Sequence, residues 1–295
     1  MGPGFSASLA RMIVTRFAPS PTGYLHLGHA YAAIRAQASG ERFLLRIEDL
    51  DATRCRAEFE RAIFEDLAWL GLEWESPVLR QSTRFAAYRA ALDTLDAAGL
   101  LYPCFCTRAD IAQASEAPHG PEGPLYPGTC GDLDAAARQA RIAAGVPYAL
   151  RLDVAKAAAN AGALSFEERG MGPNGESGIL AADPLAFGDT VLARKETPAA
   201  YHLAVVVDDA FQGVSLVTRG NDLFAATGVQ RLLQALLGLP QPAYAHHKLI
   251  LDEQGRKFSK RDNAATLRAM RESGVTAKEV RERLALTPQP RHGRA

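Results

Sequence analysis

The sequence predicts an α/β fold built on a parallel sheet. Short apolar segments alternate with segments of helical character along the chain, and this alternation is typical of strand–helix–strand units. Charged residues directly follow several of the apolar segments, and open α/β sheets bind ligands at such strand ends. The length of 295 residues indicates one large domain with an insertion or two domains, and a hydrophobic content of 47% is enough for a core.

The first half of the sheet is expected within residues 12–102. Residues 12–17 read as a short buried strand, and residues 18–23 end it because Pro and Gly interrupt regular elements. The Ala-rich segment 30–38 favours a helix, and residues 42–47 predict a second strand. Two further helices are predicted from apolar residues at helical spacing, namely Phe59, Ile63, Leu67 and Leu70 before Gly71, and Phe85, Tyr88, Leu92 and Leu95 before Gly99.

Residues 103–185 change character and are predicted as an insertion between the two halves of the sheet. They contain a cysteine cluster, a basic helix near Arg138 and Arg141, and a strand at 148–154. Residues 160–177 are rich in Gly, Asn and Ser and are expected to form a loop.

The α/β pattern returns within residues 186–240, the predicted second half of the sheet. The continuous apolar run 203–207 predicts a buried parallel strand with two aspartates directly after it. Residues 214–218 predict another strand, and residues 223–237 predict a helix that ends before Gly238.

The two ends are expected to be simpler. Residues 1–11 lack the apolar stretch of a signal peptide and read as a flexible extension, and residues 241–295 form a C-terminal segment. A net charge of +0 excludes a broad basic surface, although a local basic patch could still dock RNA. No apolar run approaches the ~20 residues that span a bilayer. A cytoplasmic, reducing location is therefore expected, and a monomer is the default expectation.

The turn His26-Leu27-Gly28-His29 is a candidate phosphate site. It lies between the first predicted strand and helix, and helix N-termini favour anions. Gly28 lets a ligand approach the backbone, and the imidazoles of His26 and His29 could donate hydrogen bonds as charge develops on a phosphate.

The loop Lys257-Phe258-Ser259-Lys260 supplies two cations far along the chain. Its lysines could clamp the same phosphates as point charges. Alone, the first motif is more often a turn and the second a solvated surface, but together they predict a site that holds ATP from two sides.

These motifs, with several others in the same order, resemble the glutamyl branch of the class I aminoacyl-tRNA synthetases. The resemblance covers roughly residues 12–267 and implies a Rossmann-like class I synthetase catalytic domain with a parallel sheet, split by a zinc-containing insertion and followed by a short α-helical C-terminal segment. The matching blocks are Arg16-Phe-Ala-Pro-Ser-Pro-Thr-Gly23 with His26-Leu-Gly-His29, Arg46-Ile-Glu-Asp-Leu-Asp51, Tyr201-His-Leu-Ala-Val-Val-Val-Asp-Asp209 and Thr218-Arg-Gly220.

Within this branch the sequence is most similar to the glutamyl-Q tRNA(Asp) synthetases. The chain stops soon after the lysine loop, whereas an anticodon-binding domain would need at least ~50 more residues. This resemblance implies activation of glutamate with ATP and no tRNA, and then transfer of glutamate to queuosine in the anticodon of tRNA(Asp). The alternatives are a truncated glutamyl-tRNA synthetase that charges a tRNA 3′ end, a non-catalytic paralogue that binds tRNA or glutamate, and a nucleotidylyltransferase of similar fold.

Six residues are expected to bind glutamate. Because glutamate has two carboxylates and an ammonium, its pocket needs cations and one carboxylate. Any one such residue alone would more often form a surface salt bridge, but the set as a whole favours a pocket. The resemblance assigns Arg16 to the side-chain carboxylate, Arg219 to the α-carboxylate, Glu48 to the ammonium, and hydroxyl or backbone contacts to Tyr201, Ser20 and Ala18.

The implied reaction is attack of a glutamate carboxylate on the α-phosphorus of ATP. Such chemistry needs positioning and charge neutralisation more than a protein nucleophile. Catalysis is expected from His26, His29, Lys257 and Lys260, and ATP contacts from His26, Gly28, His29 and Lys260. Mg²⁺ is expected to accompany ATP, held largely by phosphates and water. Four aspartates could be structural or could help to place ATP or tRNA, namely Asp49, Asp51, Asp208 and Asp209.

A structural zinc site is expected in the insertion. Zn²⁺ takes four ligands in a tetrahedron, usually from Cys and His, and the family pattern assigns Cys104, Cys106, Tyr126 and Cys130. His119 is a rival for the fourth position, and unrelated reduced cysteines are the alternative. Cys55 is expected to be an unpaired bystander.

Overall fold

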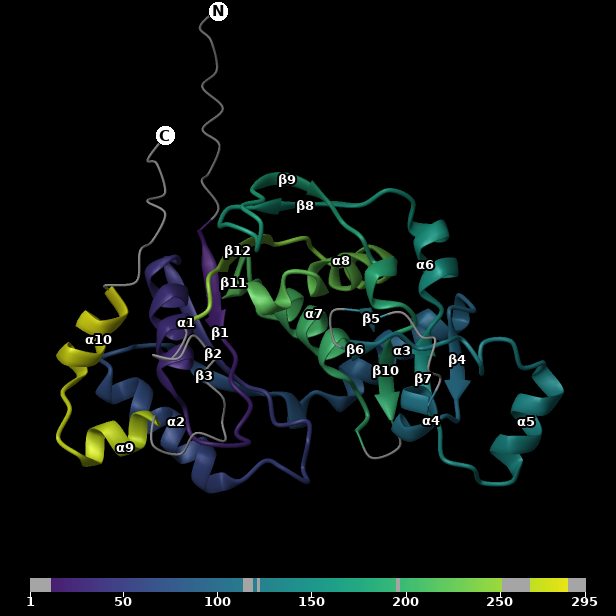
Figure 1. Ribbon diagram of the computed structural model, residues 1–295, viewed down its shortest axis with the longest axis horizontal. Helices are drawn as coiled ribbons and strands as arrows, with labels where there is room; N and C mark the ends of the chain where they lie inside the picture. Colours follow the sequence, from purple (N-terminus) through teal and green to yellow (C-terminus); the bar gives the residue numbers. More distant parts are fainter. Residues whose placement is uncertain (1–11, 114–118, 121–122, 195–196, 251–265, 286–295) are drawn as a thin grey trace, which may run out of the picture.

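The computed structural model describes residues 12–113, 119–120, 123–194, 197–250 and 266–285 (Figure 1). Its centre is a largely parallel sheet assembled from two parts. In one part β1 (Val14–Phe17) pairs with β2 (Arg42–Ile47), which pairs with β3 (Glu75–Arg80), all in parallel. The predicted α/β class with a parallel sheet is confirmed.

The other part of the sheet is built around the two strands β11 (Leu216–Gly220) and β12 (Ala243–His247), which pair in parallel. β12 also pairs in parallel with β8 (Ser165–Glu168), and β9 (Gly178–Ala181) runs antiparallel to β8. The two parts meet at β1 and β11, because the Ser215 N–H donates to the Val14 carbonyl at 3.0 Å.

Helices pack on this sheet and on one another through apolar faces. α1 (Leu27–Ala38) lies against β1 and β11, and α7 (Tyr201–Phe211) packs against α3 (Phe85–Ala97) and α8 (Ala226–Leu236). α2 (Ala57–Trp69) ends as predicted before Gly71, whose φ of 71° is a backbone conformation that glycine adopts without strain. The remaining single turns of 3₁₀ helix are η1 (Gln81–Thr83), η2 (Leu185–Phe187) and η3 (Asn221–Leu223).

An antiparallel sheet with small helices lies to one side of the parallel sheet (Figure 1). Its strand order is β10-β7-β4. The elements of this region are β4 (Leu101–Cys104), α4 (Arg108–Gln113), β5 (His119–Gly120), β6 (Gly123–Pro124), α5 (Ala135–Ala143), β7 (Ala149–Leu152), α6 (Val154–Ala161) and β10 (Val191–Arg194).

Two C-terminal helices, α9 (Leu267–Glu272) and α10 (Ala277–Ala285), pack beside α2 and α1. Leu267, Val280 and Leu284 are buried in the same apolar cluster as residues of those two helices. Helices in this segment agree with the prediction.

Two predicted elements are wrong. The run 203–207 is part of helix α7 and not a strand, because a short apolar run is equally compatible with a helix buried on all sides. The expected loop 160–177 contains β8, whose Phe166 is buried between Tyr244 and Phe224. As a result, β8 and β9 extend the parallel sheet although they lie within the span predicted as an insertion.

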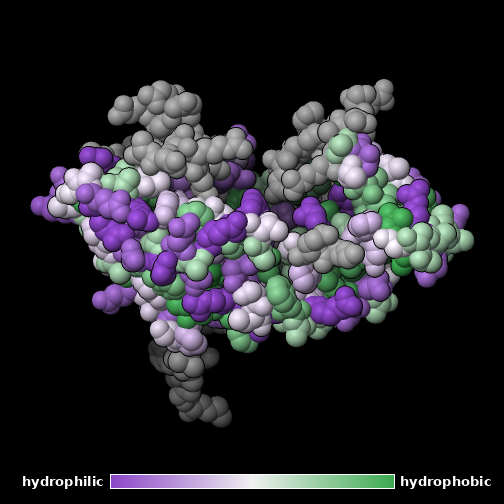
Figure 2. Space-filling view, turned by 90° about the horizontal axis from the view of Figure 1, so that it is seen from below, coloured by the Kyte–Doolittle hydropathy of each residue, from purple (hydrophilic) through white to green (hydrophobic). Residues whose placement is uncertain are grey.

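Among the described residues, no helix is both long and apolar enough to cross a membrane. The face shown in Figure 2 mixes hydrophilic and hydrophobic side chains over its whole width.

Candidate functional site

The six residues expected to bind glutamate all line one cavity of about 430 Å³. The cavity lies where β1 and β11 end, at the junction of the two parts of the sheet. These residues are Arg16, Ala18, Ser20, Glu48, Tyr201 and Arg219. A larger cavity of about 500 Å³ lies between α3, α5 and the antiparallel sheet, but no predicted site residue lines it.

Arg16 and Arg46 share one buried carboxylate. Nε of Arg16 donates to Oδ1 of Asp209 at 3.0 Å, and Nη1 of Arg46 donates to the same oxygen at 2.6 Å. Nη2 of Arg46 also donates to Glu48 at 3.2 Å, and Nη1 of Arg16 donates to the Thr218 carbonyl at 3.3 Å. Alternating charges therefore fix Arg16 and Glu48 at the wall of the cavity.

The two carboxylates of this network differ in their pKa. Burial raises the pKa of Glu48 above its ordinary value, against the opposing effect of Arg46 and Arg16. Burial acts in the same direction on Asp209, but Arg16 and Arg46 outweigh it, so the pKa of Asp209 lies below its ordinary value. Asp209 is therefore an ionised structural partner, whereas an incoming ammonium would stabilise the charged form of Glu48.

The second predicted arginine, Arg219, is held by three uncharged partners. Its guanidinium donates to His246, Gln230 and Thr227, and its side chain is buried. None of these partners was singled out in the sequence, because their roles depend on helix α8 and strand β12 lying beside β11. Arg46 did leave a signal, since it is a charged residue directly after an apolar run within a strand.

His26 and His29 cap helix α1 reciprocally. Nδ1 of His26 accepts from the Gly28 N–H at 3.1 Å, and Nδ1 of His29 accepts from the His26 N–H at 3.2 Å. A nitrogen that accepts carries no proton, so each neutral ring has its N–H at Nε2. A Cβ at Gly28 would lie 3.1 Å from Cε1 of His26, which explains why glycine suits this position. Both rings are thus set up as hydrogen-bond donors at a helix N-terminus.

A second cavity, of about 280 Å³, is lined by three of the four residues expected to contact ATP, namely His26, Gly28 and His29. It shares His29, Gly220 and two apolar residues with the first cavity. A molecule in one cavity would therefore meet a molecule in the other beside His29. Lys257 and Lys260 lie outside the described residues, but Thr266, which follows their segment, forms a β-bridge with His26.

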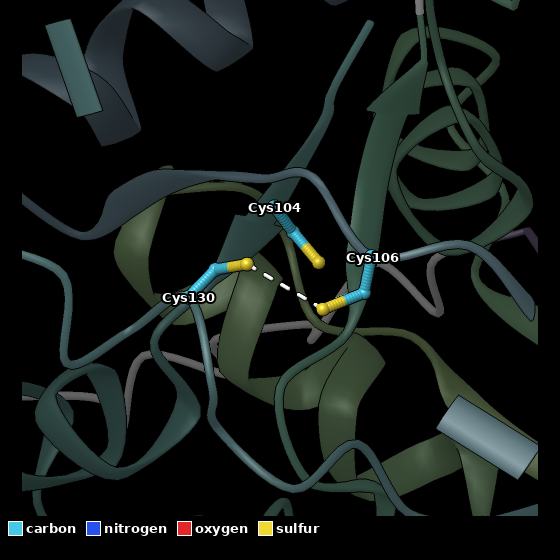
Figure 3. Close-up of side chains that lie close together, drawn as sticks. All are labelled: Cys104, Cys106 and Cys130. Atoms are coloured by element: carbon cyan, nitrogen blue, oxygen red, sulfur yellow. Dashed lines mark hydrogen bonds between the residues drawn. The ribbon is translucent and has the colours of Figure 1, made fainter. Parts of the chain in front are cut away.

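Three of the four predicted zinc ligands are cysteines that lie together (Figure 3). The sulfurs of Cys104, Cys106 and Cys130 all lie within 4.8 Å of one another, and the Cys106–Cys130 distance is 3.5 Å. Tetrahedral ligands at a Zn–S distance of ~2.3 Å are about 3.8 Å apart. The donor set therefore fits zinc in type and spacing. Cys55 is not part of this cluster.

Tyr126 adjoins the cysteines. Its hydroxyl lies 3.6 Å from Sγ of Cys106 and accepts from the Cys130 N–H at 2.7 Å. Burial raises the pKa of Cys106 to about 11. Burial also acts to raise the pKa of Cys130, but hydrogen bonds from Tyr126 and from the Phe105 N–H lower it below its ordinary value. The side chain of His119 lies outside the described residues.

The other three aspartates considered in the sequence make hydrogen bonds or ion pairs with neighbouring residues. Asp208 is buried and accepts from Gln81 and Tyr88, and it pairs with Arg84 at 3.1 Å. Asp49 accepts from the backbone and hydroxyl of Ser82, and Asp51 accepts from Thr53 and Arg54. Asp208 thereby connects α7 with α3. Asp49 and Asp51 form hydrogen bonds within the loops that follow β2 and β3.

Comparison with known proteins gives the class. The family model of the class I tRNA synthetases (E and Q), catalytic domain, matches residues 12–292. A glutamate tRNA ligase from Elizabethkingia meningosepticum, solved in complex with its amino acid, superposes with a TM-score of 0.67 at 26% identity, over 86% of this chain and 53% of that chain.

Two relatives are similar over almost the whole chain. The glutamyl-Q tRNA(Asp) synthetase of Rhodobacter capsulatus is 48% identical over 93% of this chain and 100% of its own length. That of Nocardia farcinica is 45% identical over 93% of this chain and 86% of its own length. The chain therefore belongs to the class I tRNA synthetases of the glutamate and glutamine branch, and within it to the family of glutamyl-Q tRNA(Asp) synthetases.

Proposed function

We propose that this protein activates L-glutamate with ATP in the absence of tRNA and transfers it to queuosine in the anticodon of tRNA(Asp). The observation that carries the proposal is the joined pair of cavities, one with two buried arginines and Glu48, the other at the His26 helix start. The names of the relatives support the acceptor. Since the acceptor is a tRNA, the proposed place of action is the cytoplasm.

In the first step a glutamate carboxylate oxygen attacks the α-phosphorus of ATP, and the bond to pyrophosphate breaks. Arg16 and Arg219 bind the carboxylates, Glu48 binds the ammonium, and Tyr201, Ser20 and Ala18 complete the contacts. His26 and His29 donate from Nε2 to oxygens that gain charge in the transition state. Lys257 and Lys260 hold the departing pyrophosphate, and Mg²⁺ that arrives with ATP would offset the negative charge of the phosphates.

In the second step a nucleophile of the acceptor nucleoside attacks the activated carbonyl carbon, and AMP leaves. The cysteine cluster with Tyr126 would hold a structural Zn²⁺ that fixes β4 against the segment before α5. This support of the insertion is the only role that we propose for the metal.

The test is glutamate-dependent exchange of pyrophosphate into ATP, with and without bulk tRNA. Exchange without tRNA, followed by labelling of tRNA(Asp) that contains queuosine and not of tRNA(Asp) that lacks it, is the expected result. Exchange that requires tRNA, with label at the 3′ end, would instead support a trimmed glutamyl-tRNA synthetase. No exchange under either condition would favour a binding-only paralogue. Lys260→Ala, which should exchange far more slowly, controls for contaminating synthetases.

A further inference from the structure

The guanidinium of Arg219 is fixed without being neutralised. Nε donates to Nε2 of His246 at 2.9 Å, Nη1 donates to Oε1 of Gln230 at 2.6 Å, and Nη2 donates to Oγ1 of Thr227 at 2.8 Å. A guanidinium has five N–H groups, so one N–H remains on each terminal nitrogen. In the described part of the chain, no carboxylate lies within ion-pair distance of Arg219.

Arg16 stands in a different electrostatic setting on the same cavity. Its Nε pairs directly with Asp209, which also pairs with Arg46. A protein carboxylate thus already compensates Arg16, whereas Arg219 keeps its full positive charge next to the cavity. A substrate carboxylate gains most from a cation that is desolvated and has no protein counter-ion in contact.

His246 connects Arg219 to a buried carboxylate, that of Glu168. Nδ1 of His246 lies 2.5 Å from Oε2 of Glu168, so the ring proton is on Nδ1 and Nε2 is free to accept from Arg219. Glu168 is itself fixed by the backbone N–H groups of His246 at 2.9 Å and Gly170 at 2.8 Å. Burial lowers the pKa of His246 more than Glu168 raises it, so the ring is neutral near pH 7.

The packing around this chain of contacts leaves little freedom. A Cβ at Gly170 would lie 2.3 Å from the His246 carbonyl oxygen, so the segment after β8 lies directly on β12. Tyr244 stacks parallel to the His246 ring with centroids 6.0 Å apart, and Phe224 meets its edge. The imidazole can therefore hold only a narrow range of orientations.

We propose that His246 and Glu168 are positioning residues for glutamate binding. Glu168 determines the tautomer of His246. The neutral ring of His246 orients Nε of Arg219 and at the same time separates Arg219 from the carboxylate of Glu168. The two remaining N–H groups of Arg219 then meet a carboxylate of the substrate end-on. The inference rests on the proposed glutamate substrate, and neither His246 nor Glu168 touches that substrate.

The first test compares His246→Leu with His246→Gln. Leucine fills similar space but accepts no hydrogen bond, whereas the glutamine oxygen can accept from Nε of Arg219. We expect His246→Leu to raise the KM for glutamate about tenfold or more, because the loss of one hydrogen bond to a charged group has an effect of this size. The KM for ATP should be unchanged. His246→Gln should recover most of the affinity for glutamate.

The second variant, Glu168→Gln, keeps acceptors for the two backbone N–H groups. Its amide would donate to Nδ1 of His246 and move the ring proton to Nε2, so that two N–H donors would face each other at Arg219. We expect a rise in the KM for glutamate without a comparable rise for ATP. Tyr244→Phe is the matched control, because it removes a hydroxyl bonded to Gln234 and keeps the stacked ring.

Calorimetric titration with L-glutamate accompanies the kinetics and does not depend on turnover. An unchanged KM for glutamate in both His246→Leu and Glu168→Gln would overturn the positioning role while leaving the proposed function intact. If the KM for glutamate and the KM for ATP rose equally, or if a folded His246→Gln protein did not regain affinity for glutamate, His246 would be a structural residue only. If wild-type protein neither bound glutamate nor catalysed exchange, the proposed function and this inference would both fail.

Discussion

His26, which caps the start of α1, pairs backbone to backbone with Thr266, which caps α9. The Leu267 N–H donates to the Leu25 carbonyl at 2.8 Å beside this bridge. Thr266, which follows the segment that carries Lys257 and Lys260 in the sequence, is thereby held at the histidine turn. Residues more than two hundred positions apart in the sequence therefore meet beside His26.

The first prediction concerns this anchor. Thr266→Ala removes the hydroxyl that accepts from the Ala269 N–H at 3.2 Å, and loss of such a cap costs about 1 kcal/mol. We expect a thermal midpoint lower by about 2 °C and a higher KM for ATP, because α9 would hold the lysine segment less firmly. Thr266→Ser keeps the hydroxyl and should behave as wild type. Equal behaviour of the two variants in thermal unfolding and exchange kinetics would refute the role of the cap.

The second prediction concerns Arg16. Arg16→Ala should reduce kcat/KM for glutamate by about a thousandfold, since two charge-assisted hydrogen bonds to a carboxylate would be lost. The fold should persist, because Asp209 keeps Arg46 at 2.6 Å. Initial rates of exchange at varied glutamate, together with a thermal unfolding curve, measure both effects. Near-normal exchange would remove Arg16 from the pocket.

The third prediction concerns the metal. Protein purified without chelators should contain about one zinc per chain, and a strong chelator should lower the thermal midpoint. Cys130→Ser should lose most of the zinc, and Cys55→Ser should keep it, because Cys55 is not part of the cluster. Elemental analysis of the three proteins decides the matter, and equal zinc content in all of them would place the metal elsewhere.

Tyr126→Phe separates the two candidates for the fourth ligand. If Tyr126 binds the metal, removal of its hydroxyl should weaken zinc binding in competition with a coloured chelator, while His119→Ala should not. The reverse pattern would assign the fourth position to His119.

The last prediction concerns Asp66, a buried residue of α2 that lies 3.3 Å from Arg271 of α9. Burial raises the pKa of Asp66 to about 6, although Arg271 opposes the shift. A raised carboxyl pKa stabilises the fold below the ordinary pKa, and this contribution is lost as the pH rises through about 6. Between pH 5 and pH 8 the free energy of unfolding of the wild type should therefore fall by about 1 kcal/mol relative to that of Asp66→Asn.

Urea unfolding of both proteins at pH 5 and pH 8 measures this difference. The same comparison with Glu65→Gln, an exposed partner of Arg271, should show no such dependence. If the free energies of unfolding of wild type and Asp66→Asn differed by the same amount at both pH values, the raised pKa of Asp66 would be contradicted.

Much of the fold could be predicted from local patterns, because the strand at 14–17 and the helix after the histidine turn lie beside a segment rich in Pro and Gly. The six cavity residues were expected from the resemblance to the glutamyl branch of the class I aminoacyl-tRNA synthetases, and the structure brings all six to one cavity. Misassignment of 203–207 has a clear cause, since four consecutive residues of α7, 203–206, are all buried and the apolar run therefore shows no helical stripe. Asp209 was therefore expected past a strand end, whereas it is buried in the last turn of a helix.

The supporting residues of the site could not be predicted for a different reason. Glu168, Thr227, Gln230 and His246 come from three different elements, and each acts on Arg219 only after β8, β12 and α8 are in place. Nothing in their immediate sequence distinguishes them from ordinary polar residues of strands and helices. Only the tertiary arrangement assigns them to Arg219.

The junction of β1 with β11 has a consequence for how this protein folds. Arg16 and Asp209 are 193 positions apart in the chain, yet their contact forms one wall of the pocket. Contacts of such long sequence separation form slowly, because a large loop must close first. During refolding the protein should therefore regain glutamate binding late, after most of the helical signal has returned. Glutamate binding would then indicate that the native state has formed.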